Sequence, residues 1–247
     1  MYNPYQLIGK TILVTGASSG IGRTTAIECS KLGAKLVVTA RNEVRLKETL
    51  DALEGECHQM VIADLTNSSD MEKLVESIPE LDGLVNDAGI AVMKPVPFIK
   101  QKDLEDVVNI NTFAPVLLTG AILKKKKLKR NASVVMVSSV ASMGSFELGN
   151  SIYGLSKSAI KTFAEYCAME VKNKGIRVNS VHPGMVATAM TQNTSFSETK
   201  NMDFGKYIMN RCGKPEEIAW AIAYLLSDAT QWMTGSQLVI DGGAHLT

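Results

Sequence analysis

The chain has 247 residues, with 26 lysines and arginines against 25 aspartates and glutamates, so its formal net charge is +1. This balance excludes a strong overall attraction to nucleic acid or to acidic membranes. Hydrophobic residues make up 45% of the chain and charged residues 21%, which excludes an intrinsically disordered protein. The length fits one α/β or β-barrel domain, or two small domains.

Four cysteines and three histidines are dispersed along the chain, and no two cysteines form a CxxC pair. This spacing predicts no metal site and is typical of free thiols in a reducing compartment, so we expect a cytoplasmic protein. The first ten residues lack the apolar segment of a signal peptide. The best membrane candidate, residues 113–123, is well short of the roughly 20 residues of a spanning helix, so we expect a buried helix and no membrane partner.

Short apolar, β-branched segments alternate with longer amphipathic ones. The expected strands are residues 11–16, 35–40, 57–63, 83–86, 132–139, 176–181 and 236–240. The expected helices are residues 21–32, 43–53, 69–77, 102–128, 151–173 and 215–227. Continuous apolar strands separated by helices indicate parallel strands that are covered on both faces. Repeated βαβ units then predict a doubly wound α/β sheet in a single domain, residues 1–247.

Two segments depart from this alternation. Residues 124–130, KKKKLKR, are expected at the C-terminus of a helix, where cations complement the helix dipole; a nuclear signal or a polyanion contact is the alternative. Residues 188–210 are polar with scattered apolar residues, which is typical of a lid or a disordered loop.

A glycine-rich turn, TGASSGIG at residues 15–22, follows the first expected strand and opens the first helix. Gly16, Gly20 and Gly22 allow a tight turn, close approach of the backbone to a ligand, and close helix–strand packing. The free N–H groups of the helix N-terminus favour a pyrophosphate, and Ser18 and Ser19 add hydroxyl donors. A glycine-rich turn without a ligand is the alternative.

The spacing TGxxxGxG resembles that of the short-chain dehydrogenase/reductase family, and the resemblance extends over nearly the whole chain. Further motifs carry it: Asp64-Leu65, Asn86-Asp87-Ala88-Gly89, Asn111, Ser139, Tyr153-x-x-x-Lys157 and Pro183-Gly184 before Thr188. It implies a seven-stranded Rossmann-type sheet, a nicotinamide cofactor, and oxidation of alcohols or reduction of carbonyls. The implied cofactor-binding residues are Gly16, Ser18, Ser19, Gly20, Ile21, Gly22, Arg41, Asp64, Leu65, Asn86, Ala88, Gly89, Tyr153, Lys157, Pro183, Gly184, Val186 and Thr188.

Tyr153 and Lys157 are four residues apart on an expected helix and therefore share one face. A free tyrosine has a pKa of about 10, and a nearby ammonium lowers it by stabilising the phenolate. The resemblance implies that Tyr153 is the acid/base, that Lys157 tunes it and holds the nicotinamide ribose, and that Ser139 hydrogen-bonds the substrate oxygen. Thirteen residues separate Ser139 from Tyr153, where many relatives have twelve.

Asn111 completes the expected catalytic group by resemblance, supporting a water relay to Lys157. Pro115 lies four residues later and has no N–H. If this stretch is helical, the Asn111 carbonyl loses its usual donor and is available to such a water; an ordinary proline kink is the alternative.

The cofactor is expected to be NADP rather than NAD. An acidic residue at the end of the second strand would bind the ribose 2′-hydroxyl of NAD, but Ala40 and Arg41 stand there. A guanidinium can grip a 2′-phosphate by charge-assisted hydrogen bonds. Ser19 weakens the preference for NADP, because many NADP-using relatives have a basic residue within the glycine turn.

Asp64 is expected near the adenine, and Asp87 replaces the family's commoner asparagine.

The substrate pocket is expected beyond the carboxyl ends of the strands, with walls from residues 91–98, 140–152 and 185–210. Candidate apolar contacts in it are Met143, Phe146, Met190 and Phe204. The C-terminal segment resembles the family's oligomer-forming tail, which implies a homotetramer or a homodimer.

The sequence therefore predicts an NADP-dependent oxidoreductase acting on a ketone or secondary alcohol, for which a 3-oxoacyl thioester is one candidate. The alternatives are an NAD-dependent alcohol or sugar dehydrogenase and a catalytically silent cofactor sensor. An enoyl reductase with the spacing YxxMxxxK is rejected, because Asn173 stands at the lysine position after Tyr166 and Met169.

Overall fold

The computed structural model describes residues 2–193 and 208–246. Seven parallel strands form one sheet in the order β3-β2-β1-β4-β5-β6-β7. The strands are β1 (Thr11–Thr15), β2 (Lys35–Ala40), β3 (Gln59–Ile62), β4 (Leu81–Asn86), β5 (Leu128–Val137), β6 (Arg177–Pro183) and β7 (Gln237–Ile240). The described helices are α1 (Gly20–Lys31), α2 (Glu43–Asp51), α3 (Ser68–Ser77), α4 (Gln101–Val108), α5 (Ala114–Lys124), α6 (Ser151–Glu170), α7 (Ala189–Asn193) and α8 (Pro215–Leu226). The predicted doubly wound, single-domain fold is confirmed.

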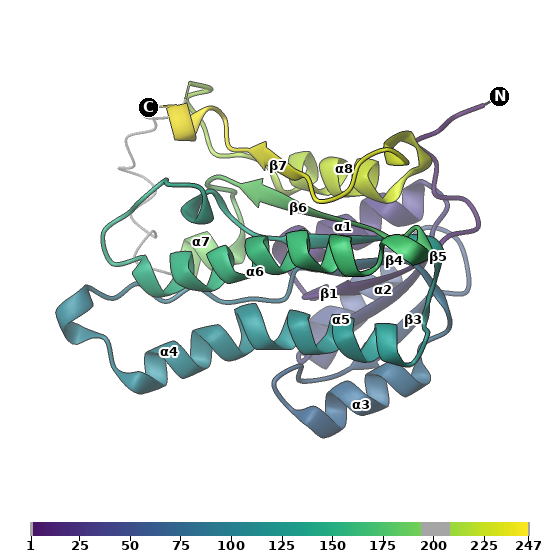
Figure 1. The fold of residues 1–247 in the computed structure, drawn as a ribbon, viewed down its shortest axis with the longest axis horizontal. Helices are drawn as coiled ribbons and strands as arrows, with labels where there is room; N and C mark the ends of the chain where they lie inside the picture. Colours follow the sequence, from purple (N-terminus) through teal and green to yellow (C-terminus); the bar gives the residue numbers. More distant parts are fainter. Residues whose placement is uncertain (1, 194–207, 247) are drawn as a thin grey trace.

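Helices cover both faces of the sheet, with α5 and α6 in front and α1 and α2 behind it in Figure 1. Alternate residues of a strand therefore enter different cores. Leu13 of β1 packs in the core formed with α3, α5 and α6, whereas Ile12 and Val14 pack in the core formed with α1, α2 and α8. Burial on both faces explains why these strands are continuously apolar.

The helix predicted over 102–128 is interrupted and ends early. A π-helical turn, η2 (Asn109–Phe113), separates α4 from α5. Pro115, which cannot donate a backbone hydrogen bond, is the second residue of α5. The prediction is wrong beyond Lys124, because Lys126 adopts a left-handed backbone (φ 56°) and Leu128 already pairs with Leu81 in the sheet.

Several lysines of the basic segment at residues 124–130 pair with groups elsewhere in the chain. Lys125 lies 3.8 Å from the Glu76 carboxylate, and Lys129 lies 2.8 Å from that of Asp82. Lys127 donates to the carbonyl of Ile78 (2.6 Å). The lysines thus tie the turn between α5 and β5 to its neighbours, and only Lys124 lies in the last turn of α5, where a cation complements the helix dipole.

The helical run Gln101–Lys124 is longer than the apolar segment considered in the sequence. Its 24 residues are long and apolar enough to cross a membrane by length and composition, but 44% of its most apolar window is buried inside the protein. A core helix passes the same test, so this is weak support for a membrane span.

The order of the strands creates a crevice at one edge of the sheet. Because all seven strands are parallel, their carboxyl ends meet at a single edge. The chain proceeds from β1 outward to β2 and β3, and then returns to β4 on the other side of β1. Such a reversal of direction leaves a crevice beyond the strand ends, where open α/β sheets bind ligands.

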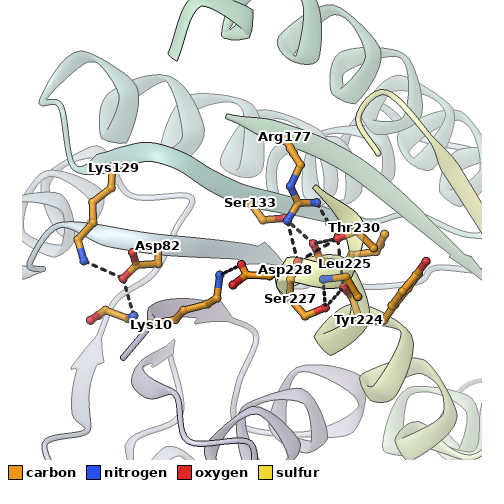
Figure 2. Close-up of polar contacts among 12 residues, drawn as sticks. Lys10, Asp82, Lys129, Ser133, Arg177, Tyr224, Leu225, Ser227, Asp228 and Thr230 are labelled. Carbon is orange, nitrogen blue, oxygen red and sulfur yellow. Dashed lines mark hydrogen bonds and ion pairs between the residues drawn. The ribbon is translucent and has the colours of Figure 1, made fainter. Parts of the chain in front are cut away.

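At the opposite edge, buried polar contacts anchor α8 to the sheet (Figure 2). Arg177, at the start of β6, donates to the Ser227 carbonyl (3.2 Å) and to the Thr230 hydroxyl (2.9 Å). Ser133 of β5 donates to the Leu225 carbonyl (2.7 Å). These bonds satisfy carbonyls at the end of α8 that have no partner within the helix.

We predict that Arg177→Met lowers the free energy of unfolding by about 1–3 kcal/mol, because it leaves buried acceptors without their charged donor. Urea denaturation measures this. Arg130→Met is the control, since Arg130 is exposed and makes one contact of 3.5 Å, to the Asn173 carbonyl. Equal losses for the two variants would contradict the proposed role of Arg177.

Candidate active site

A cavity of about 460 Å³ lies in the crevice at the carboxyl edge of the sheet. Most predicted site residues line it: Gly16, Ser18, Ser19, Gly20, Ile21, Arg41, Leu65, Ala88, Gly89, Ser139, Tyr153, Lys157, Pro183, Gly184, Val186 and Thr188. Four predicted residues lie outside this lining but next to residues that belong to it: Gly22, Asp64, Asn86 and Asn111. The fold therefore brings together motifs that are spread over more than 170 positions of the chain.

The glycines of the first turn hold the backbone close to the end of β4. A Cβ atom on Gly16, whose φ is 68°, would lie 2.9 Å from Ala88. A Cβ atom on Gly22 would lie 2.6 Å from the Asp87 carboxylate. Ser19 is the N-cap residue of α1 but makes no side-chain capping bond. The first turn of α1 contains no acidic residue, so its N-terminus suits an anion.

Lys157 is almost completely buried, and its Nζ donates to the carbonyl of Val137 at the end of β5 (2.8 Å). The same Nζ lies 5.7 Å from the centre of the Tyr153 ring. Burial lowers the pKa of Lys157 to about 8, and the charge of Asp87 opposes this shift. Tyr153 and Lys157 thus share one face of α6, as predicted, and that face is turned toward the crevice.

Burial raises the pKa of Tyr153 to about 12. The hydrogen bond with Ser139 lowers this pKa, whereas the charge of Asp87 raises it. The sequence-based prediction of a lowered pKa is therefore wrong for the protein alone, because desolvation of the phenolate outweighs the groups that favour it. A cation in contact with Tyr153, such as an oxidised nicotinamide, acts in the lowering direction.

Asn111 shapes the floor of the site through its side chain. Its Oδ1 accepts from the N–H of Ile90 (2.8 Å), and its Nδ2 donates to the Ile90 carbonyl (2.8 Å) and to the Ser156 hydroxyl (3.0 Å). These bonds fix the segment after β4 against α6. Asn111 belongs to the π-helical turn, and the predicted role of its carbonyl in holding a water remains a prediction.

Asn86 lies inside the sheet, where its Nδ2 donates to the Thr119 hydroxyl (3.2 Å). The next residue, Asp87, lines the cavity and accepts a hydrogen bond from the backbone of Gly22. Burial raises the pKa of Asp87 to about 6, although the charge of Lys157 and the Gly22 N–H both lower it. The replacement of asparagine by Asp87 therefore places a titratable group between the glycine turn and the predicted catalytic residues.

Two arginines line the cavity near the end of β2. Arg41 lies 3.7 Å from the Asp64 carboxylate and lines the cavity, as does Arg45 of α2. Burial raises the pKa of Asp64, but hydrogen bonds from Thr66 and the charge of Arg41 outweigh it, so the pKa is lowered overall. Sequence reasoning missed Arg45, which lies in the first turn of α2 while Arg41 precedes the helix.

Other lining residues were also missed by sequence reasoning. They are Asn42, Ala63, Ile90, Ile110, Val137 and Ser138. Several are small or apolar residues at strand ends, and nothing in their type distinguishes them from core residues. Met190, predicted as a substrate contact, does line the cavity.

A smaller cavity of about 100 Å³ adjoins Ser139 and Tyr153. Residues of the predicted substrate walls line it: Ala91, Val140, Ala141, Ser145, Glu147, Asn150, Met185 and Met190. Met143 and Phe146 are exposed and do not line it. The candidate Phe204 and much of the predicted lid at 188–210 lie outside the described residues.

Comparison with known proteins shows the family to which the chain belongs. The family model described as enoyl-(acyl carrier protein) reductase matches residues 16–245. The chain is 32% identical over 237 residues to a 3-oxoacyl-(acyl-carrier-protein) reductase of Rickettsia prowazekii, covering 96% of this chain and 97% of the relative. The chain belongs to the short-chain dehydrogenase/reductase family.

Two further relatives show the breadth of the family. A cyclopentanol dehydrogenase of Comamonas is 31% identical over 242 residues, with 95% of this chain and 96% of the relative covered. The crystal structure of a short-chain dehydrogenase/reductase from Mycobacterium marinum aligns with a TM-score of 0.90 at 26% identity, covering 99% of this chain and 98% of that one. The chain is thus an oxidoreductase of the NAD(P)-dependent type.

We predict that Asp87→Asn stabilises the protein in a pH-dependent manner. The carboxyl has an ordinary pKa of 3.8 and one of about 6 in the folded protein, so its ionisation destabilises the fold as pH rises through this interval. The variant's advantage in free energy of unfolding should be near zero at pH 4 and reach at most about 3 kcal/mol above pH 6.

Urea denaturation between pH 4 and pH 8 measures this difference. Asp106→Asn is the matched control, because Asp106 lies on the exposed surface of α4 in an ion pair with Lys102. An advantage that stays constant or shrinks as pH rises would show that Asp87 is not a strained buried acid.

Proposed function

We propose that this protein is an NADP-dependent oxidoreductase that interconverts a ketone and a secondary alcohol at Tyr153. The observation that carries the proposal is that Ser139, Tyr153 and Lys157 line the same cavity as the glycine turn at the start of α1. The family alone leaves cofactor and substrate open, so the proposal rests on these residues.

A dinucleotide fits the residues at this edge. The turn at Gly16 and Gly22 has no room for a Cβ atom, so its bare backbone can approach a pyrophosphate at the N-terminus of α1. The remainder of the dinucleotide would then lie along other residues that line the cavity: Leu65, Ala88, Gly89, Pro183, Gly184, Val186 and Thr188. When bound, the nicotinamide supplies a position that accepts or donates a hydride.

The chain's own residues handle the proton. The Tyr153 hydroxyl gives a proton to a carbonyl oxygen during reduction and takes one from an alcohol during oxidation. Ser139 hydrogen-bonds Tyr153 and lines both cavities, so it can hold the same substrate oxygen. Lys157, kept in place by the Val137 carbonyl, contributes positive charge beside the phenol and would hold the nicotinamide ribose.

NADP is favoured over NAD by two guanidinium groups. Arg41 and Arg45 both line the cavity at the end of β2, where the 2′-position of the adenosine ribose is expected. The Asp64 carboxylate partly neutralises Arg41, and Arg45 supplies a second cation. The absence of an acid at Ala40 removes the repulsion that would exclude a 2′-phosphate.

The substrate class is proposed from the relatives. A 3-oxoacyl thioester is the first candidate because the Rickettsia relative is a 3-oxoacyl-(acyl-carrier-protein) reductase. A small cyclic or secondary alcohol is the second candidate, after the cyclopentanol dehydrogenase. Enoyl reduction is not proposed despite the description of the family model, since Asn173 replaces the lysine of that motif.

We also propose a cytoplasmic homotetramer or homodimer. Exposed large apolar side chains lie on these neighbouring helices: Phe113 at the end of η2, Leu117 on α5, and Leu155, Tyr166 and Met169 on α6. Such faces on neighbouring helices are typical of an interface between subunits. Sedimentation that returned a monomer at micromolar concentration would contradict this assembly.

We predict that wild-type protein consumes NADPH with at least one carbonyl class in a panel of β-ketoacyl thioesters, quinones, steroids and keto-sugars. Tyr153→Phe should reduce kcat by about 10²- to 10⁴-fold, because the proton donor is lost, while the Kd for NADPH changes little. Tyr2→Phe, at an exposed tyrosine that lines neither cavity, is the control and should retain activity. NADPH binding without turnover in the wild type would favour the silent sensor instead.

We predict that Arg41→Ala and Arg45→Ala each lower kcat/KM for NADPH by about 10-fold, equal to about 1.4 kcal/mol, and leave kcat/KM for NADH nearly unchanged. Lys47→Ala is the control, since Lys47 lies on α2 but pairs with Asp51 away from the cavity. A wild-type preference for NADH would contradict the assignment of NADP.

A further inference from the structure

A fully buried histidine, His182, lies behind the predicted catalytic serine. It belongs to β6, directly before the Pro183-Gly184 pair that lines the main cavity. His182 belongs to none of the sequence motifs described above, and its ring lines neither cavity. Both of its ring nitrogens have hydroxyl partners: Nε2 lies 2.8 Å from the Ser180 hydroxyl, and Nδ1 lies 3.0 Å from the Ser142 hydroxyl.

The Ser142 hydroxyl is a junction between three elements. It donates to the Ser139 carbonyl (2.6 Å) and lies 3.1 Å from the Ser138 hydroxyl, in addition to its contact with His182. Ser138 in turn donates to the Lys157 carbonyl (2.9 Å). Through Ser142, the ring on β6 is connected to the backbone of Ser139 after the end of β5.

Counting protons assigns the tautomer of His182. The single hydroxyl proton of Ser142 is directed to the Ser139 carbonyl, so Nδ1 must donate to the Ser142 oxygen. A proton on Nδ1 also makes its contact with the Ser139 carbonyl (3.3 Å) favourable, whereas a lone pair there would repel that oxygen. Nε2 is then the acceptor for Ser180.

The surroundings of the ring keep it neutral. Burial lowers the pKa of His182; the Ser139 carbonyl and Glu165 oppose this shift, and the charges of Lys161 and Lys157 add to it. A neutral imidazole has one donor and one acceptor, which matches the two hydroxyl partners.

These bonds fix the orientation of Ser139. Its carbonyl is held by Ser142 and His182 together, at the point where β5 gives way to the 3₁₀ turn Val140–Ser142. Its Oγ already accepts from the N–H of Ala141 (3.2 Å). With the backbone of Ser139 fixed in this way, its side chain faces the cavity next to Tyr153.

We propose that His182 and Ser142 form a positioning pair that holds the Ser139 hydroxyl in register with the Tyr153 hydroxyl, so that one substrate oxygen meets both. The pair touches neither substrate nor cofactor and acts through the backbone of Ser139. This inference rests on the proposed function, because it assumes that the reacting oxygen lies between Ser139 and Tyr153.

The test compares Ser142→Ala with Ser180→Ala in the full chain. Both variants remove one hydroxyl from the same imidazole, but only Ser142→Ala breaks the link to Ser139. We expect Ser142→Ala to lower kcat by about 10- to 100-fold, since small misplacement of a reacting group has effects of this size. Ser180→Ala should stay within about twofold of the wild type, and the Kd for NADPH should be unchanged in both.

His182→Asn and His182→Phe complete the series. Asparagine retains an N–H donor near the position of Nδ1 and should recover most of kcat, whereas phenylalanine should match Ser142→Ala. The double variant His182→Asn/Ser142→Ala should be no slower than Ser142→Ala alone, because the pair acts as a unit. If His182→Phe does not fold, Ser142→Ala, Ser180→Ala and His182→Asn still decide the matter.

Equal kcat in Ser142→Ala and the wild type, or equal losses in Ser142→Ala and Ser180→Ala, would overturn the proposal. Failure of the proposed function is a different result, since the wild type itself would then lack turnover. The ¹⁵N NMR spectrum of the imidazole gives a readout that needs no substrate: a proton on Nδ1 is expected, and a proton on Nε2 would also overturn the proposal.

Discussion

The bond from the Lys157 ammonium to the Val137 carbonyl holds the candidate active site together. It joins α6 to the end of β5, so the face of α6 that carries Tyr153 is fixed opposite the serines that follow β5. A buried ammonium is strongly disfavoured without such a partner, and Asp87 supplies a compensating charge nearby. The same contact that stabilises the lysine therefore also determines where the phenol lies.

The parallel sheet determines where in the molecule this contact lies. Every strand ends at the same edge, so residues from the ends of β1, β2, β4, β5 and β6 line one cavity although they are far apart in the sequence. The helices of one face bring Tyr153, Lys157 and Asn111, while α1 on the other face brings its N-terminus. The two halves of the site, one for an anion and one for proton transfer, thus come from opposite sides of the sheet.

The sequence predicted the order of elements because apolar strands and glycine turns have strong local signals, and its resemblance to the family implied most of the cavity lining. It overextended the helix at 102–128, since the left-handed backbone of Lys126 depends on how the turn packs. It also missed the raised pKa of Tyr153 and the roles proposed here for Arg45 and His182. These depend on burial and on contacts between distant segments, and no local pattern in the chain encodes them.

A crystal structure of the protein with NADP⁺ tests the account most directly. We expect the pyrophosphate at the N-terminus of α1, the 2′-phosphate beside Arg41 and Arg45, and C4 of the nicotinamide in the part of the cavity next to Tyr153 and Ser139. The reacting carbon of a substrate would then lie about 3–3.5 Å from C4, with its oxygen facing the hydroxyls of Tyr153 and Ser139. A nucleotide bound with its nicotinamide directed away from Tyr153, or bound outside this crevice, would contradict the account.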